Sequence, residues 1–393
     1  MGVFRLFLAL SVLLGHTRGH GFFGLSFVYP EIAVQSFFMI SGFYMALVLN
    51  EKYNKPGQYI TFLQQRFLRL YPTYFILITA VVLVDLAVYG ITGHPWGSIK
   101  SWHDTTPLLT PAAFVYLALE NLIIFGQDIV MLLKMDPVTG TFHFFWHNND
   151  VKPIDGSFFL LIGSSWSLAV EFCFYVLAPF LVRRAARTQI VILALCFLVR
   201  AVMFYTIPYD AHHWIYCLFP PNLFFFMAGS LGYIIYKNYQ ARLKSLASTK
   251  PWVVVAIVAP FAILALDYCR FPGTHQLYLV WLPLVFIMVP VLFTLTCRNR
   301  VDRLIGELSY PCYLIHPHVL MFTVPLFMTT RYEWLLGPVS FVLTLILCCL
   351  FYRFIETKTE RFREGLYQKS KRASVEPAPP PVSPLESSAP TLS

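Results

Sequence analysis

Long apolar runs separated by short polar or basic segments set the pattern of this chain. Ten of these runs are close in length to the roughly 20 residues that an α-helix needs to cross the hydrocarbon core of a membrane. They cover residues 3–20, 32–49, 72–90, 158–182, 189–206, 214–236, 252–267, 277–297, 308–328 and 335–356. The pattern predicts an all-α, polytopic transmembrane protein with about ten spanning helices.

A shorter apolar run at residues 112–126 contains Glu120 and Asn121. With ten spans and a cytoplasmic N-terminus, most of the 29 Lys and Arg residues fall on the cytoplasmic side, as the positive-inside rule requires. An eleventh span would move the basic cluster at 183–187 outside and invert every later loop. We therefore expect residues 112–126 to be a re-entrant or interfacial segment, and both termini to be cytoplasmic.

The last part of the chain differs from the rest in composition. Residues 368–393 are rich in Pro and Ser and have no apolar periodicity, which is typical of a disordered tail. The sequence thus predicts a membrane domain over residues 1–367 and a disordered cytoplasmic tail over 368–393. The apolar N-terminal run is not followed by a small-residue cleavage site, so we interpret it as a retained span.

Composition supports a membrane protein and argues against other classes. The chain is 57% apolar and only 12% charged, and its formal charge of +9 comes from short clusters between apolar runs. This arrangement indicates contact with membrane lipid rather than with nucleic acid. The eight cysteines show no metal-ligand spacing, and His143 and His147 lack a third ligand at a telling distance, so no metal site is predicted.

Arg5 and His16 bracket the apolar core of the first run. Eleven helical steps place both side chains on nearly the same face and about 16 Å apart along the axis, half the thickness of a bilayer core. If Arg5 lies at the cytoplasmic surface, His16 lies near the midplane. Ionisable groups at that depth are costly and are usually functional.

Two further titratable groups are expected at a similar depth. Glu171 lies about 18 Å above the basic cluster after its span, and His316 about 19 Å above the one before its span. Pro311 is expected to break the second of these helices. Packing is the better interpretation of His316 alone, but a carboxylate in lipid needs a partner, and the His16 imidazole is a natural one. Such a carboxylate can fix the tautomer of a general base.

Polar and small residues between these groups allow two interpretations. Arg66 and Arg69 lie three residues apart, on one helix face, before the third span. They are either ordinary positive-inside anchors or a phosphate-binding pair, for which the arginine fork is suited. Ser41 and Gly42 permit the close approach of another helix or of a slender ligand, and the two interpretations are equally good.

Five motifs together carry a family resemblance. They are Arg5 with His16, SGF at 41–43, RFLRLYP at 66–72, SWSLAVEFCFY at 165–175 and LSYPCYLIH at 308–316. In this order, over about residues 1–360, they resemble the integral membrane acyltransferases called acyltransferase type 3. The resemblance implies a ten-span enzyme of the inner (cytoplasmic) membrane. It implies transfer of an acyl group, most often acetyl, from cytoplasmic acyl-CoA to a hydroxyl of an extracytoplasmic or lipid-linked glycan.

By position, the resemblance implies roles for several residues. His16 matches the essential first-span histidine, Arg5 its paired arginine, and Glu171 the glutamate of the WSL motif. Arg66 and Arg69 match the RxxR motif implicated in donor binding. Some relatives append a periplasmic esterase-like domain. This chain ends in a short tail, so direct acylation and a separate periplasmic or glycan-biosynthesis partner both stay open.

The residues themselves agree with this chemistry. The phosphates of coenzyme A can rest on Arg66 and Arg69 while its slender arm reaches the midplane, where His16, oriented by Glu171, takes the acceptor proton. Ser41, Trp166, Ser167, Tyr310 and His316 are candidates for lining the site, and Ser167, Tyr310 and Trp166 for stabilising an oxyanion. No bound cofactor is expected, since acyl-CoA is a co-substrate.

Two other functional classes are compatible with buried ionisable groups. A proton-coupled transporter of a small molecule or glycan precursor would also use His and Glu as a proton relay. It would have no special need for Arg66 and Arg69 as a pair. A purely structural membrane scaffold leaves Glu171 unexplained. CoA release from labelled acetyl-CoA, with and without a glycan acceptor, separates the three.

Overall fold

The computed structural model describes residues 1–393 except residues 26, 56, 145–152, 209–210, 250–275 and 374–393. Helices dominate the described residues. They are α1 (Gly2–Gly15), α2 (Pro30–Glu51), α3 (Tyr59–Thr92), α4 (Gly97–Thr105), α5 (Pro111–Ile123), α6 (Gln127–Val130), α7 (Trp166–Leu181), α8 (Ala186–Thr206), α9 (His213–Tyr216), α10 (Phe219–Thr249), α12 (Gln276–Thr296), α13 (Arg300–Glu307), α14 (Ser309–Phe327), α15 (Leu336–Phe351) and α16 (Thr357–Ala373). A π-helical turn, η5 (Tyr352–Glu356), joins the last two.

Five helical segments in the described part of the chain are long and apolar enough to cross a membrane. They are Pro30–Glu51, Tyr59–Thr92, Ala186–Thr206, His213–Ser245 and Glu333–Gln368. The apolar helices Gly2–Gly15, Pro111–Ile123, Trp166–Leu181 and Val280–Thr296 are shorter. The span expected at 252–267 lies outside the described residues. The chain is thus mostly helical and has several candidate membrane spans, while the count of ten stays a prediction.

Two helices contain a proline at a point where the sequence suggested a boundary or a break, and neither helix is interrupted there. Helix α3 begins at Tyr59 rather than near residue 72 and continues through Pro72, so Arg66 and Arg69 belong to the same unbroken helix as the apolar span. Pro311 does not break the ninth predicted span, because it lies in the first turn of α14, where a missing N–H leaves no helical hydrogen bond unmade. Helix α14 therefore carries His316 without interruption.

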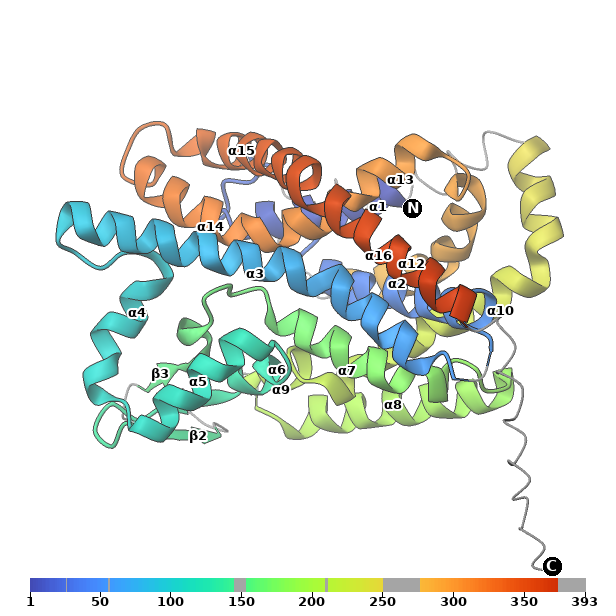
Figure 1. Ribbon diagram of the computed structural model, residues 1–393, viewed down its shortest axis with the longest axis horizontal. Coiled ribbons are helices and arrows are strands. Elements are labelled where there is room, and N and C mark those ends of the chain that lie inside the picture. The colour runs from blue at the N-terminus through green and yellow to red at the C-terminus, as the bar shows by residue number, and fades with distance from the viewer. Residues whose placement is uncertain (26, 56, 145–152, 209–210, 250–275, 374–393) are drawn as a thin grey trace, which may run out of the picture.

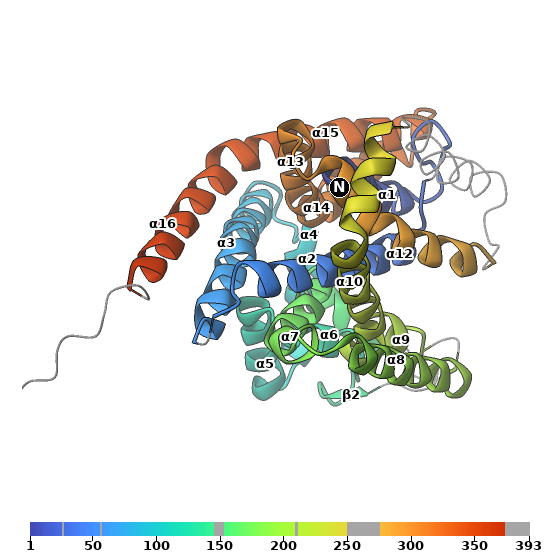
Figure 2. The same ribbon diagram turned by 90° about the vertical axis from the view of Figure 1, so that its right-hand side faces the viewer.

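Helix α2 lies at the centre of the bundle, packed against α1, α7, α10 and α12 (Figure 2). Its closest neighbour is α10, and a Cβ atom placed on Gly42 would lie only 2.0 Å from the Phe226 carbonyl oxygen. Gly229 of α10 approaches the Met39 backbone in the same way. Gly42 thus provides close helix packing, as one of the two interpretations predicted.

The arginine-bearing end of the bundle is fixed by contacts to helix termini. Asp302 of α13 accepts hydrogen bonds from the first backbone N–H groups of α1, Gly2 at 2.8 Å and Val3 at 3.0 Å. Arg183 donates to the Leu49 carbonyl oxygen, 3.2 Å away, near the C-terminus of α2. A carboxylate at a helix N-terminus and a cation at a C-terminus both complement the helix dipole. We call this end of the bundle, which carries Arg5, Arg66, Arg69 and Arg183, the basic end.

The opposite end carries a small mixed region built from residues between α3 and α7 (Figure 1). It contains α4, α5, α6 and a sheet of three short antiparallel strands in the order β2 (Phe142–Phe144), β1 (Leu133–Met135) and β3 (Ile154–Asp155). Helix α5 has 13 residues, which is shorter than the roughly 20 that a span needs. The run at 112–126 thus forms a short helix within the region expected to lie outside.

The structure describes only the first residues of the predicted C-terminal tail, 368–373. Helix α16 packs on α3 at the basic end and continues to Ala373, so it includes the first residues of the predicted tail. Residues 374–393 lie outside the described part of the chain. Disorder of the tail, and a domain boundary at 367, stay predictions.

Candidate active site

A cavity of about 470 Å³ extends from residues of the basic end into the bundle between α1, α2, α3, α7, α12, α13 and α14. Its volume is in the range of small-molecule sites. Most of the residues singled out from the sequence line it: Arg5, Ser41, Arg66, Arg69, Ser167, Glu171 and Tyr310. His16, Trp166 and His316 lie outside its wall. Five segments of the chain, α1, α2, α3, α7 and α14, therefore bring these residues around one space.

Arg69 is held by an ion pair that the sequence did not predict. Its Nη2 atom lies 3.1 Å from Oε2 of Glu307, the last residue of α13, and each side chain is 21% exposed. Burial raises the pKa of the Glu307 carboxyl, but the charges of Arg69 and Arg5 outweigh it and hold that pKa below its ordinary value. The signal in the sequence was the presence of two acidic residues, Asp302 and Glu307, in the basic segment at 298–307, which topology alone would assign to a loop.

Arg66, one helical turn before Arg69, has no comparable ion pair among the described residues. Its Nε atom is buried, and among the described residues it has no hydrogen-bond partner. The guanidinium lies 5.7 Å from the centre of the Phe62 ring. A buried donor without a partner is rare in proteins. Because Arg66 also lines the cavity, its free donors are available to an anionic ligand there.

Glu171 is held by residues other than the one expected. Its Oε1 atom accepts hydrogen bonds from Ser41 Oγ of α2, at 2.6 Å, and from Tyr175 Oη one turn along α7, at 2.5 Å. Within the described part of the chain, no hydrogen bond joins Glu171 to His16. In the structure Glu171 is thus paired with Ser41 and Tyr175 rather than with His16.

His16 obtains its orientation from its own helix. The residue is the C-cap of α1, one position beyond the last helical residue, and its Nδ1 atom lies 2.7 Å from the Val12 carbonyl oxygen. Since a carbonyl oxygen can only accept, Nδ1 carries the hydrogen and Nε2 has a free lone pair in the neutral ring. The side chain is exposed. His16 is therefore prepared to accept a proton at Nε2 without a carboxylate partner.

His316 lies next to His16 and links it to the cavity. The two imidazole centroids are 5.5 Å apart, and the Tyr313 ring centroid lies 5.8 Å from that of His316. Only 2% of His316 is exposed, and its Nδ1 atom has no hydrogen-bond partner among the residues that the structure describes. Tyr313 lines the cavity. His316 is thus in ring contact with one residue of the cavity wall and with His16.

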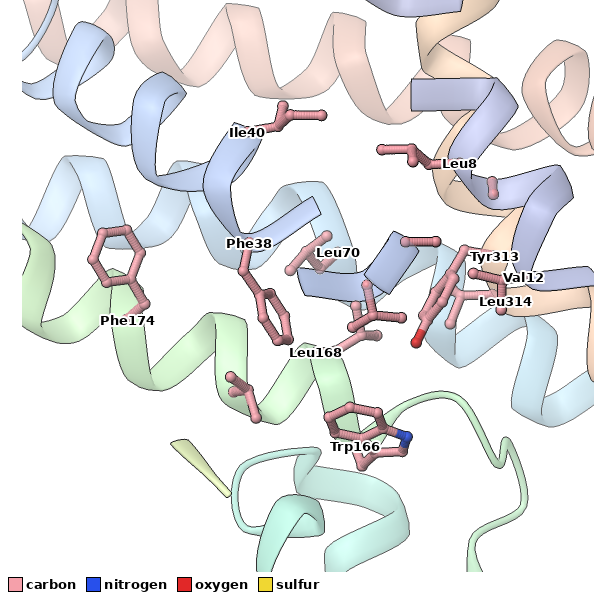
Figure 3. Close-up of a cluster of buried hydrophobic side chains, with 14 of the residues drawn as sticks. Leu8, Val12, Phe38, Ile40, Leu70, Trp166, Leu168, Phe174, Tyr313 and Leu314 are labelled. Carbon is pink, nitrogen blue, oxygen red and sulfur yellow. The ribbon is translucent and has the colours of Figure 1, made fainter. Parts of the chain in front are cut away.

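The three candidates for oxyanion stabilisation occupy different settings. Tyr310 Oη donates to the Leu70 carbonyl oxygen at 2.7 Å. Trp166 is buried outside the cavity wall, with its ring 4.8 Å from that of Tyr216. Ser167 Oγ donates to the Ser164 carbonyl oxygen at 3.0 Å and lies 2.9 Å from Tyr313 Oη. Figure 3 shows Tyr313 between α1 and the start of α7, where Trp166 and Leu168 lie.

Metal-ligating side chains do not gather in the described part of the chain. No group of three or more His, Cys, Asp or Glu residues there is arranged to hold an ion. His143 is in β2, whereas His147 lies outside the described residues. The expectation of no metal site stays a prediction.

Apolar helices of membrane-spanning length and an interior cavity lined by Arg5, Arg66 and Arg69 are typical of a membrane-embedded binding or catalytic site. The model of the acyltransferase type 3 family, described as an acyltransferase domain, matches residues 1–353. The chain therefore belongs to this family and is a membrane acyltransferase. No curated protein and no solved structure matches it.

Proposed function

We propose that this protein transfers an acyl group, most simply acetyl, from cytoplasmic acyl-CoA to a hydroxyl of an extracytoplasmic or lipid-linked glycan. The observation that carries the proposal is the cavity that leads from Arg5, Arg66 and Arg69 to the wall in front of His316 and His16. The acyl-CoA donor and the glycan acceptor also follow from the resemblance of the five motifs to the family.

The donor end fits a polyanion with a slender arm. Arg66 offers unpaired guanidinium donors, and Arg69 adds positive charge while Glu307 holds its side chain in place. The phosphates of coenzyme A would bind there, with charge-assisted hydrogen bonds. The pantetheine arm would then extend past Glu171, whose carboxylate can accept from an amide N–H. This role of Glu171 replaces the orientation of His16 that the sequence suggested.

The reaction would take place where the arm ends, near Tyr313. The acceptor oxygen attacks the thioester carbonyl carbon while His16 Nε2 takes the hydroxyl proton. The C–S bond then breaks, and the CoA thiolate receives that proton as it leaves. His16 is exposed and is not part of the cavity wall, which would let donor and acceptor approach from different directions.

The membrane arrangement that this reaction needs is part of the proposal. Ten spans in the inner membrane, with both termini cytoplasmic, would place the basic end at the cytoplasmic face and the region between α3 and α7 outside. The distribution of Lys and Arg supports this orientation. A separate glycan-biosynthesis partner would deliver the acceptor if it is lipid-linked.

CoA release tests the proposed function. Purified protein in nanodiscs would be given labelled acetyl-CoA, with and without cell-surface glycan that mild alkali has freed of its O-acyl groups. We expect release that depends on the glycan, with label appearing in it. Uptake or export without CoA release would instead identify a proton-coupled transporter. The absence of both activities would favour a purely structural scaffold.

A further inference from the structure

The cavity wall changes in character along its length. On α2 the wall extends from Val48, near the basic end, to Val34, a rise of about 21 Å at 1.5 Å per residue. Ser41 lies midway and bonds to Glu171 of α7. The residues that line the cavity on α2 before Ser41, on α7 before Glu171 and on α14 carry no charge. The cavity therefore has a charged part at the basic end and an uncharged part away from it.

Large side chains from three helices close the uncharged part. Phe37 of α2 and Tyr313 of α14 meet there, with ring centroids 6.2 Å apart. The start of α7 lies against the same tyrosine, because Ser167 Oγ is 2.9 Å from Tyr313 Oη. Val34 and Leu168 complete this part of the wall, and both are nearly fully buried. Since protein interiors are close-packed, little free volume remains beyond these side chains. We call Val34, Phe37, Leu168 and Tyr313 the inner end.

The chemistry of acyl-CoA gives it one favourable direction in this cavity. Its phosphates are anionic, and its acyl group is at the opposite end of the pantetheine arm. The phosphates bind arginines, which line the charged part, so the acyl group comes to lie at the inner end. Burial of alkyl carbons against apolar side chains is favourable there. The inner end is also connected to the expected base, because the His316 ring contacts both Tyr313 and His16.

We infer that the inner end is the acyl pocket of this acyltransferase and that Phe37 restricts it to short acyl groups such as acetyl. The inference rests on the proposed function. A longer acyl chain would need the space that the Phe37 ring fills, and inserting extra carbons into a close-packed site is unfavourable. A single methylene group changes the preference of an apolar pocket by about 10- to 200-fold. Phe37 thus determines specificity and takes no part in the chemical step.

Two thioether analogues test the pocket without turnover. S-ethyl-CoA imitates acetyl-CoA, and S-hexyl-CoA carries a longer chain. Their Kd values would be measured by titration calorimetry on the full chain in nanodiscs, with empty nanodiscs as the blank. We expect wild type to bind S-ethyl-CoA at least about 10-fold more tightly, and Phe37→Ala to change the ratio of the two Kd values by about 10- to 100-fold towards S-hexyl-CoA. A ratio within about threefold of wild type, or a wild type that prefers S-hexyl-CoA, would overturn the inference.

A matched pair of milder variants keeps the test decisive if Phe37→Ala does not fold. Phe37→Leu and Phe174→Leu each replace a phenyl ring by a smaller apolar side chain. Phe174 is fully buried on α7 outside the cavity wall, and its ring stacks on that of Phe226, with centroids 4.2 Å apart. Phe37→Leu should shift the ratio of Kd values by about 3- to 10-fold towards S-hexyl-CoA. Phe174→Leu should leave it within about twofold. Equal shifts would indicate a general loosening of the bundle and would overturn the role of Phe37.

Turnover distinguishes a failure of this inference from a failure of the proposed function. In the glycan-dependent assay, Phe37→Ala should raise kcat/KM for hexanoyl-CoA relative to acetyl-CoA by about 10- to 100-fold. If wild type releases CoA from acetyl-CoA but the variant has the same donor preference, the inference alone is refuted. If wild type releases CoA from neither donor, the proposed function is refuted, while the analogue titrations still decide whether Phe37 limits the pocket.

Discussion

Arg69 Nη2 lies 3.1 Å from Glu307 Oε2, whereas Arg66, one helical turn earlier, has a buried Nε atom without a partner in the described part of the chain. Two arginines that a sequence pattern treats as a pair therefore have different environments. One is neutralised by a carboxylate from a distant helix, and the other still has donors to give to a ligand.

We expect Arg66→Gln and Arg69→Gln to act on different properties. Arg66→Gln should raise the KM for acyl-CoA by about 10- to 100-fold with little loss of stability, because it removes a charge-assisted hydrogen bond to the donor. Arg69→Gln should mainly lower the thermal stability, since Glu307 then stays half-buried without its cation. Steady-state kinetics and thermal unfolding in detergent measure the two effects. Equal effects on KM would contradict this division of roles.

Glu307 should make stability depend on pH in a defined direction. The pKa of its carboxyl is lowered in the folded protein, so its stabilising contribution is complete above the ordinary value of 4.5 and is lost as the pH falls through the lower folded value. The melting temperature of wild type should therefore exceed that of Glu307→Gln at pH 6, and the difference should shrink below pH 4.5. A difference that grows on acidification would show that the ion pair does not form.

Replacement of His16 tests the general base. His16→Ala should reduce glycan acylation by about 10²-fold or more, a usual contribution of general base catalysis. The protein should still insert and melt normally, because the side chain is exposed and, among the described residues, its hydrogen bond goes to the backbone of its own helix. Surface-glycan acyl content and membrane-fraction yield are the measurements. Retained acylation would exclude His16 as the base.

Gly42 should be a sensitive position for the packing of α2 on α10. Gly42→Ala places a methyl group 2.0 Å from the Phe226 carbonyl oxygen, and we expect a destabilisation of about 3 kcal/mol. Gly163→Ala is a suitable control, since a Cβ atom there would have no neighbour within 4 Å. Thermal unfolding of the two variants compares them directly. An unaffected Gly42→Ala would mean that the helices can separate at little cost.

Some features of this protein follow from its sequence alone. Apolar runs and basic clusters identify a membrane protein, and the five ordered motifs identify the family that the match over residues 1–353 shows. Helical spacing puts Arg66 and Arg69 on one face. These features depend on residues close together in the chain or on fixed helical geometry, and so they can be read without tertiary structure.

Other features were decided only by tertiary packing. Counting residues along a helix gives the height of Glu171 and His16 but not the direction in which each side chain points. Helices that are apolar on every side carry little information about how they rotate against their neighbours. For this reason Glu171 faces Ser41, His16 turns to Val12, and the Glu307 partner of Arg69 came from a contact between distant segments.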